Sequence, residues 1–157
     1  MTPAEQHLWS QYSCVPRSII ELANRNGKPI SVDDYVDRFR STLELKSDMF
    51  GLMLIVDAIN TAIQLGLCSK YHHIAGPELF RLHLRQFRGT STGILVTTHR
   101  EVIQGKWAEL NHCRLVTSYN KSEWQVDDVG PDQIARPAML SDQYLMQRNA
   151  QFFHLYQ

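Results

Sequence analysis

Residues 112–128 read HCRLVTSYNKSEWQVDD, and this stretch decides the fold class. It contains two runs rich in apolar, aromatic and β-branched residues, Cys113 to Tyr119 and Glu123 to Asp127. Residues of this kind favour strands. Asn120-Lys121 between the runs is typical of a tight turn. The stretch therefore predicts an antiparallel β-hairpin.

The same hairpin is expected to bring a histidine and an aspartate together. In an antiparallel hairpin the end of one strand lies beside the start of the other, so Asp128 returns next to His112. A carboxylate in that place would orient the imidazole, as the third member of a catalytic triad does. Only one of the neighbouring residues Asp127 and Asp128 can face His112, because successive side chains of a strand point to opposite faces. The pattern also fits a packed histidine and an acidic turn before Gly130.

The residues before this hairpin follow a helical pattern in the first half of the chain. Apolar residues recur at helical spacing after Cys14, and Asn26-Gly27 marks the end of that helix. Ser31 followed by an acidic third position predicts a second helix that reaches Arg40. A broad apolar stripe predicts a third helix from about Ser47 to Leu65.

The second half of the chain has the character of a sheet. We expect a strand at Tyr71 to Ala75, a helix after Gly76-Pro77, a strand over 93–98, an amphipathic turn over 141–148 and a last strand at Phe152 to Tyr156. Helices first and strands afterwards predict an α+β fold. With 157 residues, the chain is expected to form a single domain, with a helical subdomain over about 1–70 and a sheet subdomain over about 71–157.

Cys14 is the candidate nucleophile. It lies where a polar lead-in, Ser10 to Ser13, turns into the first predicted helix. The N-terminus of a helix presents unpaired backbone N–H groups and the positive end of the helix dipole, and both favour the thiolate. The same N–H groups can hold an oxyanion in acyl transfer. A buried core cysteine is the plainer interpretation, and position alone does not separate the two.

Composition excludes several other classes of protein. Sixteen Lys and Arg balance sixteen Asp and Glu, so a nucleic-acid partner is not expected. The three cysteines include no Cys-x-x-Cys pair, and the spacing of His72, His73, His83 and His99 fits no compact ligand motif. We therefore expect no metal and no cofactor. The N-terminal segment has neither a basic start nor an apolar core, and the longest apolar stretch contains polar residues, so neither a signal peptide nor a membrane segment is predicted.

The arrangement of these residues resembles a papain-like cysteine peptidase of the bacteriocin-processing type, the double-glycine leader peptidase domain. The similarity covers nearly the whole chain in the same order. Its motifs are Ser13-Cys14-Val15-Pro16 before a helix that ends at Asn26-Gly27-Lys28-Pro29-Ile30-Ser31, ELFRLHLRQFRG before GILVTT, the hairpin over 112–128, and Leu140-Ser141-Asp142-Gln143-Tyr144-Leu145 before FFHLY.

The resemblance implies roles for three residues. Cys14 is the implied nucleophile, His112 the general base and then acid, and an aspartate sixteen residues beyond His112, Asp128, the orienting group. Two departures mark the chain as diverged. Val15 replaces the glycine that usually follows the nucleophile, and Arg17 stands where a small residue is common.

The remaining site residues are less clearly marked in the sequence. The oxyanion glutamine of the family lies about six residues before the cysteine, where this chain has Leu8. Gln11 is the preferred substitute because it is nearer the nucleophile, and Gln6 is the alternative. Trp9 and Ser13 are candidates for contact with substrate. For Trp9 the sequence does not distinguish a subsite wall from a cover for the core.

We expect a cysteine peptidase that cleaves a protein or peptide, with small residues such as Gly-Gly before the scissile bond implied by the resemblance. The chain also resembles the papain-like toxin domains that bacteria deliver into other cells. This resemblance implies a bacterial effector or toxin domain that is cytoplasmic in the producing or a target cell and is neutralised by a cognate immunity protein. Maturation of leader peptides is the alternative. A deamidase, transglutaminase or acyltransferase with the same triad, and an inactive peptide-binding relative, are the other interpretations.

Overall fold

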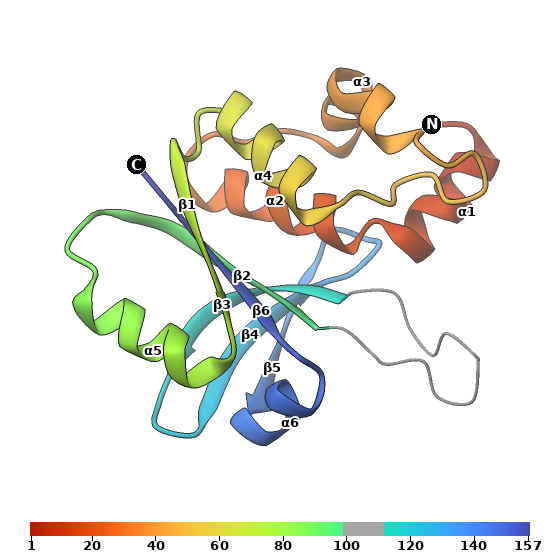
Figure 1. Cartoon of the computed structure of the whole chain (residues 1–157). Coiled ribbons are helices and arrows are strands. Elements are labelled where there is room, and N and C mark those ends of the chain that lie inside the picture. Colours follow the sequence, from red (N-terminus) through yellow and green to blue (C-terminus); the bar gives the residue numbers. More distant parts are fainter. Residues whose placement is uncertain (99–111) are drawn as a thin grey trace.

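The computed structural model describes residues 1–98 and 112–157 as an α+β fold (Figure 1). Four helices come first: α1 (Pro3–Tyr12), α2 (Cys14–Arg25), α3 (Val32–Leu43) and α4 (Ile55–Gln64). They are followed by β1 (Lys70–Ala75), α5 (Pro77–Gln86), β2 (Ser91–Thr98), β3 (His112–Tyr119), β4 (Glu123–Val129), β5 (Ala135–Ser141), α6 (Asp142–Gln147) and β6 (Gln151–Tyr156).

The strands form one sheet, and every pair of neighbours in it is antiparallel. Over the described residues the order is β1-β6-β2-β3-β4-β5, so the last strand of the chain lies between the first two. The predicted hairpin is β3 and β4, and the register places Leu115 opposite Asp127 and Val116 opposite Val126. The sheet therefore joins distant parts of the chain, while the hairpin at its centre is local.

Helices cover both faces of this sheet. In Figure 1, α1 to α4 form a layer on one side, and α5 and α6 lie on the other. Strand alternation supplies a core for each side. Leu95 and Leu115 belong to the apolar cluster shared with α1 to α4, whereas Val96 and Val126 belong to the cluster with α5 and α6. The helix α2 is buried over most of its length and contacts β2, β3 and β4 directly.

The expected helical first half and antiparallel second half are confirmed, with three differences. The helix α1 is absent from the prediction, although Thr2 and Glu5 form a capping box at its start. The third helix begins at Ile55 rather than near Ser47. Gly51 lies before it with φ of +95°, a left-handed conformation that ends helices, and its Cα faces the side chains of Trp9 and Ser13.

The strand β5 is the other element absent from the prediction. Its sequence, ARPAMLS, contains Pro137, and proline is disfavoured in the interior of a sheet. In the structure β5 is an edge strand that pairs only with β4 among the described strands, and edge strands tolerate proline.

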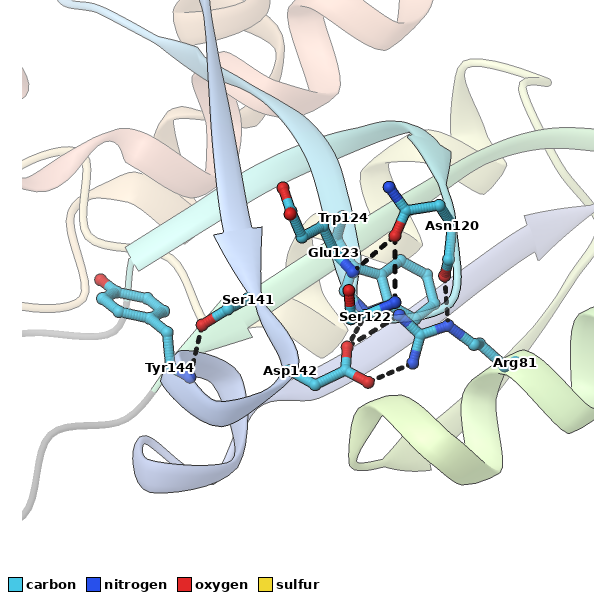
Figure 2. A network of polar contacts seen from close by, with 8 residues as sticks. All are labelled: Arg81, Asn120, Ser122, Glu123, Trp124, Ser141, Asp142 and Tyr144. Atoms are coloured by element: carbon cyan, nitrogen blue, oxygen red, sulfur yellow. Dashed lines mark hydrogen bonds and ion pairs between the residues drawn. The ribbon is translucent and has the colours of Figure 1, made fainter.

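A polar network joins α5, α6 and the β3–β4 turn at the end of the sheet distant from the N-terminal helices (Figure 2). The carboxylate of Asp142 accepts hydrogen bonds from Nη2 of Arg81 at 2.7 Å and from Nε1 of Trp124 at 2.9 Å. Arg81 also donates from Nε to the backbone oxygen of Asn120 at 2.8 Å. The fully buried Trp124 indole is thereby fixed to the start of α6, and the Arg81 guanidinium joins α6 to the turn of the hairpin.

Candidate active site

The structure brings Cys14, His112 and Asp128 together from three elements. Cys14 is the first residue of α2, His112 is the first of β3, and Asp128 is the next-to-last of β4. Packing of α2 against β3 and β4 brings the thiol to the imidazole, and the two side chains are hydrogen-bonded. On its other side, Nε2 of His112 lies 2.6 Å from Oδ2 of Asp128.

The three groups shift one another's proton affinity. Burial raises the pKa of the Cys14 thiol, but the hydrogen bonds from His112 and from the Cys113 backbone outweigh it and leave the pKa below the usual value. The hydrogen bonds to Asp128 and Cys14 raise the pKa of His112 to about 9. Burial opposes ionisation of Asp128, yet its hydrogen bond with His112 keeps its pKa below the usual value. This electrostatic arrangement favours a thiolate beside an imidazolium.

The two neighbouring aspartates of β4 have different partners. Asp128 contacts His112, whereas Oδ2 of Asp127 lies 2.7 Å from Nη2 of Arg25, at the end of α2. The alternation of the strand separates them, as the sequence predicts. Asp127 therefore joins the sheet to a helix, and of the two only Asp128 is placed to orient the imidazole.

The other two cysteines lie in different surroundings. Both are buried, and burial raises the pKa of Cys68 to about 11. The pKa of Cys113, one residue from His112 and on the opposite side of the strand, is also raised by its burial. Among the three thiols, only that of Cys14 has a lowered pKa.

A cleft of about 1050 Å³ opens over these residues. Cys14, His112 and Asp128 all line it. The segment before and into α4 forms another part of its lining, where the side chains of Leu54 and Val56 are 67% and 47% exposed. The thiol is therefore nearly buried, yet it borders a space large enough for a segment of peptide.

Of the two candidate glutamines, Gln11 lines this cleft and Gln6 does not. Gln11 lies at the end of α1, lines the same cleft as Cys14, and its Nε2 is 3.2 Å from a ring nitrogen of His7. Gln6 lines a different, smaller hollow near Val32 and Pro131. The placement favours Gln11, the sequence's first choice, over Gln6.

Trp9 and Ser13 lie in the core rather than in the cleft lining. Trp9 is 3% exposed and packs in the cluster beneath the helices, and Ser13 is fully buried. Ser13 donates to the backbone oxygen of Trp9, which fixes the junction between α1 and α2. This placement favours a structural role for the two residues over the predicted contact with substrate, because neither side chain lines the cleft that contains Cys14.

Two arginines near the site were not among the candidates. Arg17 and Arg114 both line the cleft, and Nε of Arg114 lies 3.4 Å from Oδ2 of Asp128. The positive charges of Arg114 and Arg17 help to lower the pKa of Asp128. Strand alternation could have indicated Arg114 as a site residue, because it lies two residues after His112 and therefore on the same face of the strand. Arg17 was visible in the sequence only as a departure from the family pattern.

Within residues 1–98 and 112–157, no group of three or more His, Cys, Asp or Glu side chains is arranged to hold a metal ion. His99 lies outside the described residues. No helix in the described part of the chain has the length and apolarity needed to cross a membrane.

Comparison with known proteins supports the fold. The structure is similar to the peptidase domain of Streptococcus ComA, described as a bifunctional ABC transporter involved in a quorum-sensing pathway. The TM-score is 0.59 with 13% sequence identity, and the match covers 92% of each chain. No protein-family profile and no curated protein matches the chain. The expected papain-like cysteine peptidase fold is confirmed.

Proposed function

We propose that this chain is a cysteine peptidase with Cys14 as nucleophile, His112 as general base and acid, and Asp128 as the orienting carboxylate. One observation carries the proposal: the Cys14 thiol is hydrogen-bonded to His112, which Asp128 holds at 2.6 Å, and the group borders an open cleft. The fold of a solved peptidase domain supports the same class of activity.

The geometry supports a nucleophilic mechanism through an acyl-enzyme. The Cys14 thiolate attacks the scissile carbonyl carbon and forms a tetrahedral intermediate. Because Nε2 of His112 faces Asp128, the other ring nitrogen, Nδ1, gives its proton to the leaving amine as the C–N bond breaks. His112 then takes a proton from water, whose oxygen attacks the thioester. The carboxylic acid product and the Cys14 thiolate are released, with the proton back on His112.

The oxyanion of the intermediate needs hydrogen-bond donors. The backbone N–H of Cys14, at the start of α2, and the side-chain amide of Gln11 are the proposed donors. The position of Gln11 in the cleft lining supports this assignment, and the positive end of the α2 dipole favours negative charge at the same place.

The proposed substrate is a peptide segment or an exposed segment of a protein. Leu54 and Val56 offer exposed apolar surface in the cleft lining, which favours apolar side chains of the substrate. Cleavage after small residues such as Gly-Gly is carried over from the sequence resemblance as part of the proposal.

The test is a comparison of the wild-type chain with Cys14→Ala on a mixed-sequence peptide library read by mass spectrometry. We expect new peptide termini with the wild type and none with Cys14→Ala. Cys68→Ala is the matched control and should cleave like the wild type, because Cys68 does not line the cleft and its pKa is raised. A mass change without cleavage would support a deamidase or acyltransferase instead, and binding without either would support an inactive relative.

For the biological setting we propose a bacterial effector or toxin domain with a cognate immunity protein. The support is the sequence resemblance to such domains. A small protein encoded next to this chain's gene should inhibit peptide cleavage when the two are mixed at equal concentration. An exporter gene in that place would favour leader-peptide maturation.

A further inference from the structure

Arg17 is the buried cation of the active site. Its side chain follows Cys14 by one helical turn in α2 and is 5% exposed, although it lines the cleft. Arginine side chains are rarely buried to this extent without a carboxylate partner. The contacts of this guanidinium therefore need an explanation.

The guanidinium joins three segments of the chain. Its Nε donates to the backbone oxygen of Val129, the residue after Asp128, at 2.9 Å. Its Nη1 lies 3.3 Å from the backbone oxygens of Trp9 and Ser10, in α1, and 3.0 Å from Oγ of Ser13. One planar group thus ties the end of α1 and the start of α2 to the end of β4.

These acceptors are neutral oxygens, so within the described residues no carboxylate hydrogen-bonded to Arg17 repays its burial. The negative groups that influence its charge are the Cys14 thiolate, Asp128 and Asp132, and each favours the charged form. Burial lowers the pKa of Arg17, but an arginine begins so far above neutral pH that the charge is retained. In return, its positive charge helps to lower the pKa of Cys14.

We infer that Arg17 is a positioning residue for the nucleophile. It fixes Cys14, at the start of α2, against the strand that carries Asp128, and it holds a permanent positive charge beside the thiolate. The inference deepens the proposed function, on which it rests, because a clamp at this point aligns the attacking sulfur with His112. Arg17 does not itself need to touch the substrate.

The experiment compares Arg17→Met, Arg17→Lys and Arg81→Lys in the full chain. Arg81 is the matched control because it is buried to a similar degree, 6% exposed, and its guanidinium also joins elements, but in the network around Asp142 (Figure 2). The readout is the rate of Cys14 alkylation by iodoacetamide from pH 5 to pH 10, followed by peptide mass spectrometry. Thermal unfolding is measured for every variant.

We expect Arg17→Met to move the pH midpoint of Cys14 alkylation upward by about one unit, which makes the reaction about ten-fold slower at pH 6. Arg17→Lys should recover part of this shift, because it keeps the charge but lacks the planar fork. Arg81→Lys should lower the unfolding temperature and leave the midpoint unchanged. With a cleaved peptide as substrate, Arg17→Met should lower kcat at least ten-fold with KM within two-fold of the wild type.

An unchanged midpoint in folded Arg17→Met would overturn the inference, as would an equal shift in Arg81→Lys. If Arg17→Met does not fold, Arg17→Lys decides, and a midpoint identical to the wild type overturns the inference. Alkylation requires no substrate, so its result is independent of peptide cleavage. Failure of the wild type to cleave any peptide would overturn the proposed function, while the shifted midpoint would still assign the electrostatic role to Arg17.

Discussion

Nε2 of His112 and Oδ2 of Asp128 lie 2.6 Å apart across a single hairpin, although sixteen positions separate the two residues in the chain. The orienting contact of the candidate triad is therefore a local property of β3 and β4. The thiol, in contrast, comes from another layer of the molecule. This division of the site determines how each residue is expected to respond to substitution.

The two aspartates of β4 should differ sharply in effect. Asp128→Asn is expected to lower kcat/KM by roughly 100-fold, because the imidazole loses the carboxylate that orients it and stabilises its charge. Asp127→Asn should stay within two-fold of the wild type, since it removes a partly exposed pair with Arg25 worth at most about 1 kcal/mol. Kinetics on one cleaved peptide check both. Equal losses in the two variants would argue against the assignment of Asp128.

The pH profile of activity should be bell-shaped. Activity rises as Cys14 ionises below its usual range and falls as His112 loses its proton at a pKa of about 9. Because Asp128 is the main cause of the raised pKa of His112, Asp128→Asn should move the alkaline limb to lower pH. The measurement is kcat/KM from pH 5 to pH 10. An alkaline limb that stays in place in the variant would contradict the coupling between the two side chains.

Two glutamine variants test which side chain donates a hydrogen bond to the oxyanion. Gln11→Ala should lower kcat by roughly 100-fold with little change in KM, because the donor acts on charge that develops in the transition state. Gln6→Ala should retain the wild-type kcat, since Gln6 lies outside the cleft that contains Cys14. The opposite pattern would assign the oxyanion contact to Gln6.

His154 makes stability depend on pH. It is 1% exposed, its ring nitrogens lie 2.8 Å from Nε2 of His83 and from Oγ of Ser91, and Phe80, Phe87 and Tyr156 surround it. Burial, followed by the charges of His83 and His72, lowers its pKa to about 4. At this residue the unfolded chain therefore binds more protons than the folded chain between about pH 4 and 6.5, so the contribution of His154 to stability should fall as the pH drops through that range.

Urea unfolding at pH 7 and pH 4.5 measures this effect. The wild type should lose more stability between the two values than His154→Gln, which removes the titrating ring. His7→Gln, at an exposed position, should follow the wild type. The prediction fails if His154→Gln and the wild type lose equal stability on acidification.

The sequence predicted the parts of the molecule that depend on neighbouring residues. The hairpin follows from the residue types of its two strands and its turn, and strand alternation allows only one of Asp127 and Asp128 to face His112. The choice of Asp128 came from the spacing that the family resemblance implies. The helix α1 escaped because its apolar pattern is weak, although its capping box was present at Thr2 and Glu5. The strand β5 was not predicted, because proline is compatible with an edge strand but not with a central one. The residues of a strand do not show whether it lies at the edge of a sheet.

The contact between Cys14 and His112 required more than local pattern. It depends on how α2 docks on the sheet, and the resemblance to a known fold supplied that expectation. Arg17 was missed as a site residue because its role is tertiary: its guanidinium reaches Val129, 112 positions away. The predicted helix over 47–65 was too long, because Gly51 adopts a left-handed conformation and lies against Trp9 and Ser13. The apolar stripe does not reveal this tertiary contact.

The nucleophile and its base lie on different layers of the molecule, and this has a consequence for how activity is lost on heating. Cys14 belongs to the layer of N-terminal helices, while His112 and Asp128 both lie on the β3–β4 hairpin. A small slip between layers would separate sulfur from imidazole while each layer kept its own hydrogen bonds. On heating, catalysis should therefore be lost a few degrees below the melting temperature measured by circular dichroism. The reactivity of the Cys14 thiol then reports how tightly the two layers are packed.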